Sequence, residues 1–147
     1  MTDGIFRLVY CSSNTIDARD GDPAAEIAGI LAVSRANNGR DGITGALLYS
    51  DGSFAQVLEG PLDVVQRAFE RIQRDERHGS VIVLEARLTE ARMFGMWDMA
   101  LANPADPEQV RATLGHALSE PYGDAGMTVV ALLDSLVRRE GEWASAA

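Results

Sequence analysis

The chain has 147 residues, a net charge of −9 and 46% hydrophobic residues, values that fit one globular domain. The acidic balance argues against direct binding of nucleic acid, which needs a basic face. No apolar run approaches the roughly 20 residues of a membrane span, so we expect no membrane contact. Cys11 is the single cysteine, which leaves no intrachain disulfide and no cysteine metal cluster. Together with a start that lacks a signal-peptide pattern, these features predict a cytoplasmic protein.

The first part of the chain predicts a strand followed by a helix. Residues 5–12 form a mostly apolar run in which Phe6, Leu8 and Tyr10 share one face by the two-residue period of a strand. After a polar stretch, Asp22 is a candidate N-cap and Pro23 a candidate first helical residue. The helix that they open is expected to end at Gly39, a plausible C-cap.

The middle of the chain predicts a second helix and four more strands. These elements are expected at residues 43–50, 53–59, 80–88 and 94–102 for the strands and about 60–76 for the helix. Asp51-Gly52 between the first two strands is a strong hairpin signal. The resulting order, β-α-β-β-α-β-β, predicts an α+β, ferredoxin-like sheet with one extra strand. Right-handed crossovers then place both helices on one face of the sheet.

The pattern changes after a cluster of helix breakers around Pro104. Two shorter amphipathic segments follow, at residues 107–118 and 127–140. We expect them to form a C-terminal helical cap on the other face of the sheet, with a partner-binding tail as the alternative. The chain therefore divides into residues 1–103, which hold the predicted sheet, and residues 104–147, a cap or output segment.

A set of polar side chains falls where a small α/β core should be apolar. Tyr10 ends an apolar strand run, Asn38 ends a helical stripe, and Gln56 lies inside the strand predicted at residues 53–59. A buried carboxamide without partners costs roughly 1–3 kcal/mol, so a core with two of them needs something to bind. These residues predict a site for a flat heterocycle that carries both donors and acceptors, and not a hydrolytic centre.

Five short motifs, taken in their order along the chain, carry a resemblance to a known family. They are Leu8-Val9-Tyr10, Asn37-Asn38 with Ile43-Thr44-Gly45-Ala46-Leu47-Leu48-Tyr49, Phe54-Ala55-Gln56-Val57-Leu58-Glu59-Gly60, Arg71-Ile72-Gln73-Arg74-Asp75-Glu76-Arg77-His78, and Arg92-Met93-Phe94-Gly95-Met96-Trp97-Asp98-Met99. Over residues 6–101 the chain resembles a BLUF domain, the flavin-based blue-light sensor module. It is most similar in layout to a short stand-alone protein of that family.

The resemblance implies FAD, bound noncovalently with its isoalloxazine ring between the two helices. Tyr10 matches the light-reactive tyrosine of the family, and Gln56 matches its switching glutamine. Asn38 matches the asparagine that holds the carbonyl edge of the flavin. Trp97 and Met99 match the pair that reports the light signal.

Further cofactor contacts follow from the same resemblance. Asn37, Arg71 and Asp75 match flavin-contacting positions, although some members carry histidine in place of Asn37. Arg77 and His78 are candidates for contact with the rest of the cofactor, including its phosphate. The alternative for these last two residues is an exposed position that only meets solvent.

The chemistry of these side chains agrees with a flavin. The ring edge has acceptors at N5, O4 and O2 and a donor at N3, which carboxamides such as Asn38 and Gln56 can pair. Arg71 can donate to the C2 carbonyl, while Asp75, four residues later, can hold its guanidinium. Ser34, one helical turn before Asn38, is a candidate support for the ring edge.

Two other functions are compatible with the predicted fold. A small enzyme would use Glu59, His78 or Asp98 as acid or base, but no Ser/His/Asp order, metal-ligand spacing or phosphate loop supports it. A flavin-free interaction module is the second alternative, and the intact polar set argues against it. We therefore expect neither enzymatic activity nor a bound metal. We also expect that the protein forms a homo-oligomer and that its signal passes to an unidentified downstream protein.

Overall fold

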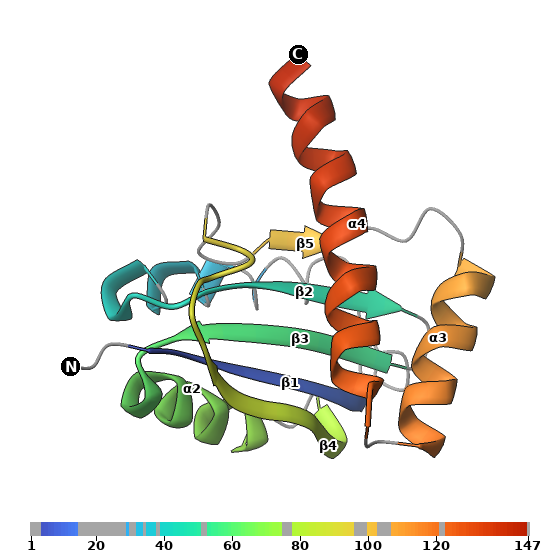
Figure 1. The fold of residues 1–147 in the computed structure, drawn as a ribbon, viewed down its shortest axis with the longest axis horizontal. Helices are drawn as coiled ribbons and strands as arrows, with labels where there is room; N and C mark the ends of the chain where they lie inside the picture. Colours follow the sequence, from blue (N-terminus) through green and yellow to red (C-terminus); the bar gives the residue numbers. More distant parts are fainter. Residues whose placement is uncertain are drawn as a thin grey trace.

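The structure is a computed structural model that describes most of the chain. The described residues are 4–14, 29, 32–33, 35–37, 39–50, 53–74, 78–95, 100–102, 107–120 and 123–146. Within them a five-stranded sheet forms the centre of the molecule, with the strand order β4-β1-β3-β2-β5 (Figure 1). None of the helices in this part of the chain has the length and apolar character needed to cross a membrane.

The sheet has the predicted ferredoxin-like topology. Its strands are β1 (Ile5–Asn14), β2 (Thr44–Ser50), β3 (Ser53–Gly60), β4 (His78–Thr89) and β5 (Ala100–Ala102). β1 lies in the middle and pairs antiparallel with both β3 and β4. β2 pairs antiparallel with β3 and parallel with β5, which is the additional strand at the edge. The α+β class and the strand arrangement expected from the sequence are therefore confirmed.

The first helix extends beyond the residue at which the sequence predicts its end. The described residues between 29 and 41 are helical, and the helix continues past Gly39 to residue 41. Gly42 then has a φ of 76°, the left-handed conformation that glycine adopts readily after a helix. The prediction of Gly39 as the C-cap is wrong, because the residue that turns the chain toward β2 is Gly42.

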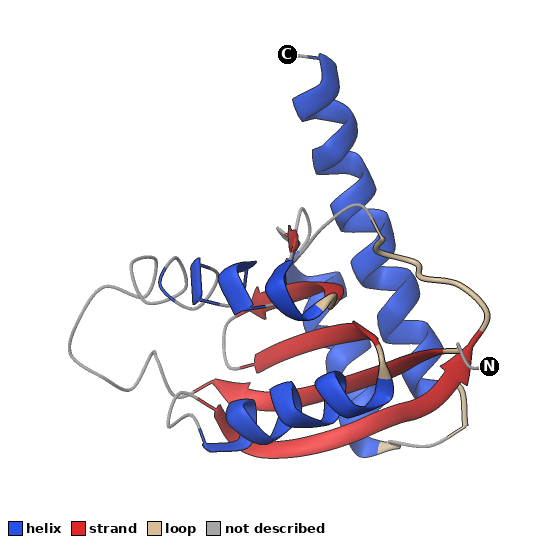
Figure 2. Ribbon diagram, turned by 90° about the vertical axis from the view of Figure 1, so that its left-hand side faces the viewer, coloured by secondary structure: helices blue, strands red, loops and turns tan. Residues whose placement is uncertain are grey.

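Helices cover both faces of the sheet. Figure 2 shows α2 (Leu62–Arg74) and the helical part of residues 29–41 in front of the sheet, with α4 behind it. The helices behind the sheet are α3 (Pro107–Ser119) and α4 (Ala125–Ala146). The C-terminal end of α4 extends beyond the sheet (Figure 1). The expected helical cap is therefore present on the face opposite α2.

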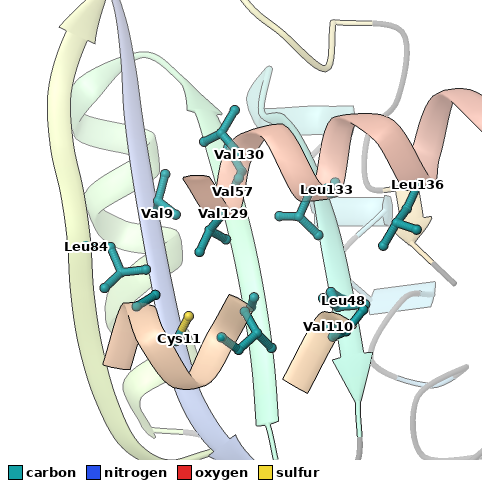
Figure 3. Packing of buried hydrophobic residues seen from close by; sticks show 14 of the residues in the cluster. Val9, Cys11, Leu48, Val57, Leu84, Val110, Val129, Val130, Leu133 and Leu136 are labelled. Carbon is teal, nitrogen blue, oxygen red and sulfur yellow. The ribbon is translucent and has the colours of Figure 1, made fainter. Parts of the chain in front are cut away.

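Two clusters of buried hydrophobic residues occupy the two faces. The α2-side cluster contains Leu8, Tyr10, Ile43, Leu47, Phe54, Leu58, Val65 and Ala68. The cap-side cluster, which Figure 3 shows in part, includes Val9, Cys11, Leu48, Val57, Leu84, Phe94, Val110, Val129, Val130, Leu133 and Leu136. β1 thus buries side chains on both faces, with Tyr10 toward α2 and Cys11 toward the cap.

The last predicted strand differs most from the structure. Residues 90–95 form bends and a turn, and β5 is only three residues long. Phe94 is fully buried in the cap-side cluster, and its backbone N–H donates to the Glu59 carboxylate instead of to a neighbouring strand. The prediction of a strand that begins at Phe94 is therefore wrong. Residues 96–99 lie outside the described part of the chain.

Candidate functional site

The polar pair expected from the sequence lies at the centre of the sheet. Tyr10 on β1 is the direct cross-strand partner of Gln56 on β3. The Tyr10 hydroxyl donates a hydrogen bond to Gln56 Oε1. Tyr10 is fully buried and Gln56 is only 4% exposed, so the bond lies away from solvent.

The α2-side cluster surrounds this pair with apolar side chains. The Tyr10 ring lies 5.5 Å from the ring of Phe69 on α2, with an angle of 51° between the ring planes. Phe54 and Leu58 flank Gln56 on the same face of β3, because alternate strand residues share a face. A hydrogen bond is stronger in such a surrounding, and a polar group without a partner is more costly there. The orientation of the Gln56 amide is therefore coupled to the Tyr10 hydroxyl.

Arg71 lies in the last turn of α2, close to the end of the first helix. Its Nη2 atom is 3.8 Å from Asp41 Oδ2, and Arg40 Nε also donates to Asp41 Oδ1 over 3.1 Å. The hydrogen bond from Arg40, followed by the charges of Arg40 and Arg71, holds the pKa of Asp41 below its usual value. Asp41 is thus a partner of Arg71 that the sequence did not suggest, while the expected partner, Asp75, lies outside the described residues.

The other predicted cofactor contacts are described only in part. Asn37 is half-buried on the first helix, and His78 is the first residue of β4. The predicted site residues that fall outside the described part of the chain are Ser34, Asn38, Asp75, Arg77, Trp97 and Met99. The structure therefore joins Tyr10 to Gln56 and places Arg71 on the same side of the sheet.

A buried ion pair on the cap side was not foreseen from the sequence. Arg7 Nε donates to Glu59 Oε2 over 3.2 Å, and both side chains are almost completely buried. The same carboxylate accepts the backbone N–H groups of Met93 and Phe94, each over 2.8 Å. The sequence does contain a signal for this pair, because Arg7 and Glu59 are each a charged residue inside an apolar strand run.

These contacts bear on the small-enzyme alternative. The Glu59 carboxylate is fully buried and engaged by an arginine and two backbone donors, so it is not available as the acid or base proposed for it. Asp98, a second candidate, lies outside the described residues. Among the residues that the structure describes, no three His, Cys, Asp or Glu side chains come together to hold a metal ion.

Arg92 joins the segment after β4 to the sheet and to the first helix. Its Nη1 donates to Thr44 Oγ1 over 2.9 Å and to the backbone oxygen of Glu59 over 3.1 Å. Its Nη2 donates to the backbone oxygen of Gly42 over 2.7 Å. One guanidinium therefore connects the end of the first helix with β2 and β3.

The groups on the α2 side fit the edge of a flavin. The Gln56 carboxamide offers two donors and one acceptor and is held against the Tyr10 phenol. The Arg71 guanidinium, on the same side of the sheet, suits a ring carbonyl. This set combines donors, an acceptor and an oxidisable phenol, which is the chemistry that the resemblance implies.

Comparison with known proteins agrees with this interpretation. Residues 5–100 match the profile of the BLUF family, described as sensors of blue light using FAD. The chain is similar to the blue light- and temperature-regulated antirepressor BluF of Escherichia coli (strain K12), with 32% identity over 83 residues. The match covers 56% of this chain and 21% of BluF, so it spans a minor part of that relative.

Solved structures of similar proteins cover nearly the whole chain. The dark-state structure of BlrB, a BLUF protein, is 30% identical and superposes with a TM-score of 0.71, covering 95% of this chain and 99% of BlrB. The photo-activated state of BlsA is 27% identical with a TM-score of 0.72, covering 90% of this chain and 94% of BlsA. The similarity therefore includes the cap helices as well as the sheet.

Proposed function

The chain belongs to the BLUF family of flavin-based blue-light sensors, and we propose that Tyr10 and Gln56 form its light-driven switch and that its flavin is FAD. The observation that carries this proposal is the buried hydrogen bond from the Tyr10 hydroxyl to Gln56 Oε1. It joins an oxidisable phenol to an amide that can take two orientations. Such a pair can donate an electron and then exchange hydrogen-bond partners.

The proposed photocycle begins and ends at Tyr10. The bound flavin supplies the absorption of blue light and an excited ring that takes an electron. Tyr10 gives up that electron, and its hydroxyl proton moves along the hydrogen bond toward Gln56 Oε1. The Gln56 amide then rotates or tautomerises and changes its hydrogen-bond partners. During recovery the electron and the proton return to Tyr10, so the cycle involves no net oxidation.

The proposed flavin-binding residues come from both helices on the α2 side. Arg71 would donate to a ring carbonyl, and its proximity to Asp41 supports a position between the two helices. Asn38 would hold the carbonyl edge of the ring, and Asn37 would make a further contact with the flavin. The remaining proposed contacts are Ser34, Asp75, Arg77 and His78.

The proposal assigns signalling, and no catalysed reaction, to this chain. Residues 1–103 would form the flavin-binding domain and residues 104–147 the output segment, with Trp97 and Met99 reporting the state of the flavin site. The signal would leave through contacts with a downstream protein, and the antirepressor named among the relatives supports that kind of partner. We also propose that the protein is cytoplasmic and forms a homo-oligomer. Analytical ultracentrifugation in the dark and under light would measure the oligomeric state.

Flavin reconstitution and absorption spectroscopy test the proposed switch. The protein should bind FAD stoichiometrically and show a small, reversible red shift under blue light. Tyr10→Phe keeps the aromatic ring and should keep the flavin, but it should lose the red shift because the hydroxyl is gone. A protein that stays colourless with flavin, or a Tyr10→Phe variant that still shifts, would contradict the proposal.

A second tyrosine provides the matched control. Tyr49 on β2 is half-buried on the same side of the sheet, and its ring lies 5.6 Å from the ring of Phe54. Tyr49→Phe removes an equivalent hydroxyl from outside the proposed switch. This variant should keep both the flavin and the red shift.

A further inference from the structure

Gln56 and Glu59 of β3 lie three positions apart and on opposite faces of the sheet. Gln56 bonds to Tyr10 on the α2 side, whereas Glu59 bonds to Arg7 on the cap side. The strand itself connects the two side chains. A displacement of β3 that accompanies a change at Gln56 therefore also displaces the Glu59 carboxylate.

The Glu59 carboxylate holds the turn that follows β4. It accepts the backbone N–H groups of Met93 and Phe94. The Phe94 side chain is a fully buried member of the cap-side cluster, together with Val110 of α3 and Leu133 of α4, which Figure 3 shows packed over the sheet. Glu59 thus connects β3 with a residue that belongs to the core of the cap.

Arg92 attaches the same turn to β3 a second time. It donates to the backbone oxygen of Glu59, so the turn contacts both the backbone and the side chain of one residue. A buried carboxylate needs more donors than one arginine supplies, and the turn provides two of them to Glu59. The double attachment indicates that the position of residues 92–94 depends on the position of β3.

A row of charged residues continues from Glu59 to the start of α4. Arg7 Nη1 lies 3.9 Å from Glu85 Oε2 on β4. Gly126, in the first turn of α4, packs so close to Glu85 that a Cβ added there would lie 2.5 Å from Glu85 Cβ. The beginning of α4 therefore contacts β4 directly, beside the ion pair of β1 and β3.

We propose that Glu59 is a positioning residue that couples the Gln56 strand to the cap helices, so that a change at Gln56 reaches α4 through the Glu59 carboxylate and the turn at residues 92–94. This inference rests on the proposed function of Tyr10 and Gln56. The carboxylate is fully buried and bonded to Arg7 and two backbone N–H groups. It cannot follow β3 without moving its donors or leaving buried groups unbonded, since no solvent replaces a lost partner.

Hydrogen exchange of the full-length, FAD-loaded protein, in the dark and under blue light, tests the coupling. Wild-type protein should show a light-dependent change of exchange in residues 125–137 of α4. Glu59→Gln keeps the size of the side chain but replaces an acceptor oxygen with an NH2 donor. It should retain the red shift, while the light-dependent change in α4 falls at least about fivefold, the lower end of common coupling strengths. Glu70→Gln, which alters an exposed glutamate of α2, is the control and should behave like wild type.

Flavin-free protein separates this inference from the proposed function. There Glu59→Gln should speed the exchange of the Met93 and Phe94 amides, because their acceptor is weakened whether or not flavin binds. If Glu59→Gln does not fold, Arg92→Gln takes its place, since Arg92 is only half-buried and holds the same turn. An intact red shift and a full light-dependent change in α4, despite faster exchange of the two amides, would overturn the coupling. A wild-type protein without a red shift would overturn the proposed function.

Discussion

Each face of the sheet buries one polar pair that joins β1 to β3, and both pairs are direct cross-strand partners. On the α2 side the pair is Tyr10 with Gln56, two neutral groups joined by a hydrogen bond. On the cap side the pair is Arg7 with Glu59, two charged groups. The Glu59 carboxylate also accepts the backbone N–H groups of Met93 and Phe94.

This difference indicates which face is suited to change and which is suited to hold its arrangement. A hydrogen bond between neutral groups contributes only about 0.5–1.5 kcal/mol net, so one partner can be exchanged for another at modest cost. Removal of one member of a buried ion pair costs about 3–5 kcal/mol, because the other charge is left uncompensated. The α2 side can therefore switch its hydrogen bonds while the Arg7–Glu59 pair on the cap side stays intact and moves with β3.

The largest effect is expected when the cap-side pair is broken. Glu59→Ala should lower the free energy of unfolding of the flavin-free protein by about 3–5 kcal/mol, since Arg7 loses its nearest carboxylate and the Met93 and Phe94 amides lose their acceptor. Urea denaturation measures this change. Glu70→Ala, at an exposed position of α2, should change stability by less than about 0.5 kcal/mol. A loss of only about 1 kcal/mol for Glu59→Ala would show that the charged pair contributes no more to stability than a neutral hydrogen bond does.

The fold could be predicted from the sequence because most of its signals are local. Short apolar runs mark the strands, and Asp51-Gly52 marks the hairpin. The end of the first helix was misplaced because Gly39 follows two asparagines and resembles a C-cap, whereas the left-handed residue is Gly42. Which glycine ends the helix depends on where the chain must enter β2, and that is a property of the tertiary structure.

The candidate site could be predicted only where polarity contrasts with the surrounding sequence. Tyr10 and Gln56 stand out in apolar strand runs. Arg7 and Glu59 carry the same signal, but they are 52 residues apart and only the register of β1 with β3 joins them. The neighbour of Arg71 was missed for a similar reason, because local spacing favours a partner on the same helix and the structure provides Asp41 from another.

The pH dependence of stability tests how fully the cap side excludes water. Burial raises the pKa of the Cys11 thiol from 9.0 to about 12. The neutral thiol is favoured in the folded state, so its contribution is complete below pH 9 and is lost as the pH rises toward about 12. Between pH 9 and about pH 10.5, wild type should lose roughly 1–2 kcal/mol more stability than Cys11→Ala does.

Urea denaturation of both proteins across this pH range provides the measurement. Tyrosines titrate in the same range, and the comparison with Cys11→Ala removes their contribution. Only the change with pH is compared, because the substitution also leaves a small cavity. Parallel curves for the two proteins would show that solvent reaches Cys11 and that the cap side is not dry.

A smaller effect than that of Glu59→Ala is expected when the neutral pair is broken. Gln56→Leu replaces the carboxamide with an apolar side chain of similar size inside the α2-side cluster. The flavin-free protein should lose about 1–3 kcal/mol of stability, because the buried Tyr10 hydroxyl loses Gln56 as its acceptor. Gln66→Leu on the exposed face of α2 is the control. A loss as large as that of Glu59→Ala would mean that the α2 side is held as firmly as the cap side.

The smallest effect is expected at the edge of the α2 side, where Asp41 meets Arg71. Asp41→Asn keeps the size of the side chain and an acceptor for Arg40, but it removes the charge that faces the guanidinium. Because exposed ion pairs contribute about 0.2–1 kcal/mol, the dissociation constant for FAD should rise about 1.5- to 5-fold in a fluorescence titration. Asp63→Asn is the matched control, since Asp63 pairs with Arg67 at the same 3.8 Å but lies in the first turn of α2, whereas Arg71 lies in its last turn.

Salt sharpens this last test. The difference between wild type and Asp41→Asn should shrink at high ionic strength, because an exposed ion pair is screened. An unchanged dissociation constant would remove Asp41 from the site. Tighter binding by the variant would show that Asp41 competes with the flavin for Arg71, so that the α2 side must release an ion pair before it can bind its cofactor. In that case the Asp41–Arg71 ion pair would have a role of its own on the α2 side, as the Arg7–Glu59 pair has on the cap side. The Tyr10–Gln56 bond would then be the feature that distinguishes the side that switches.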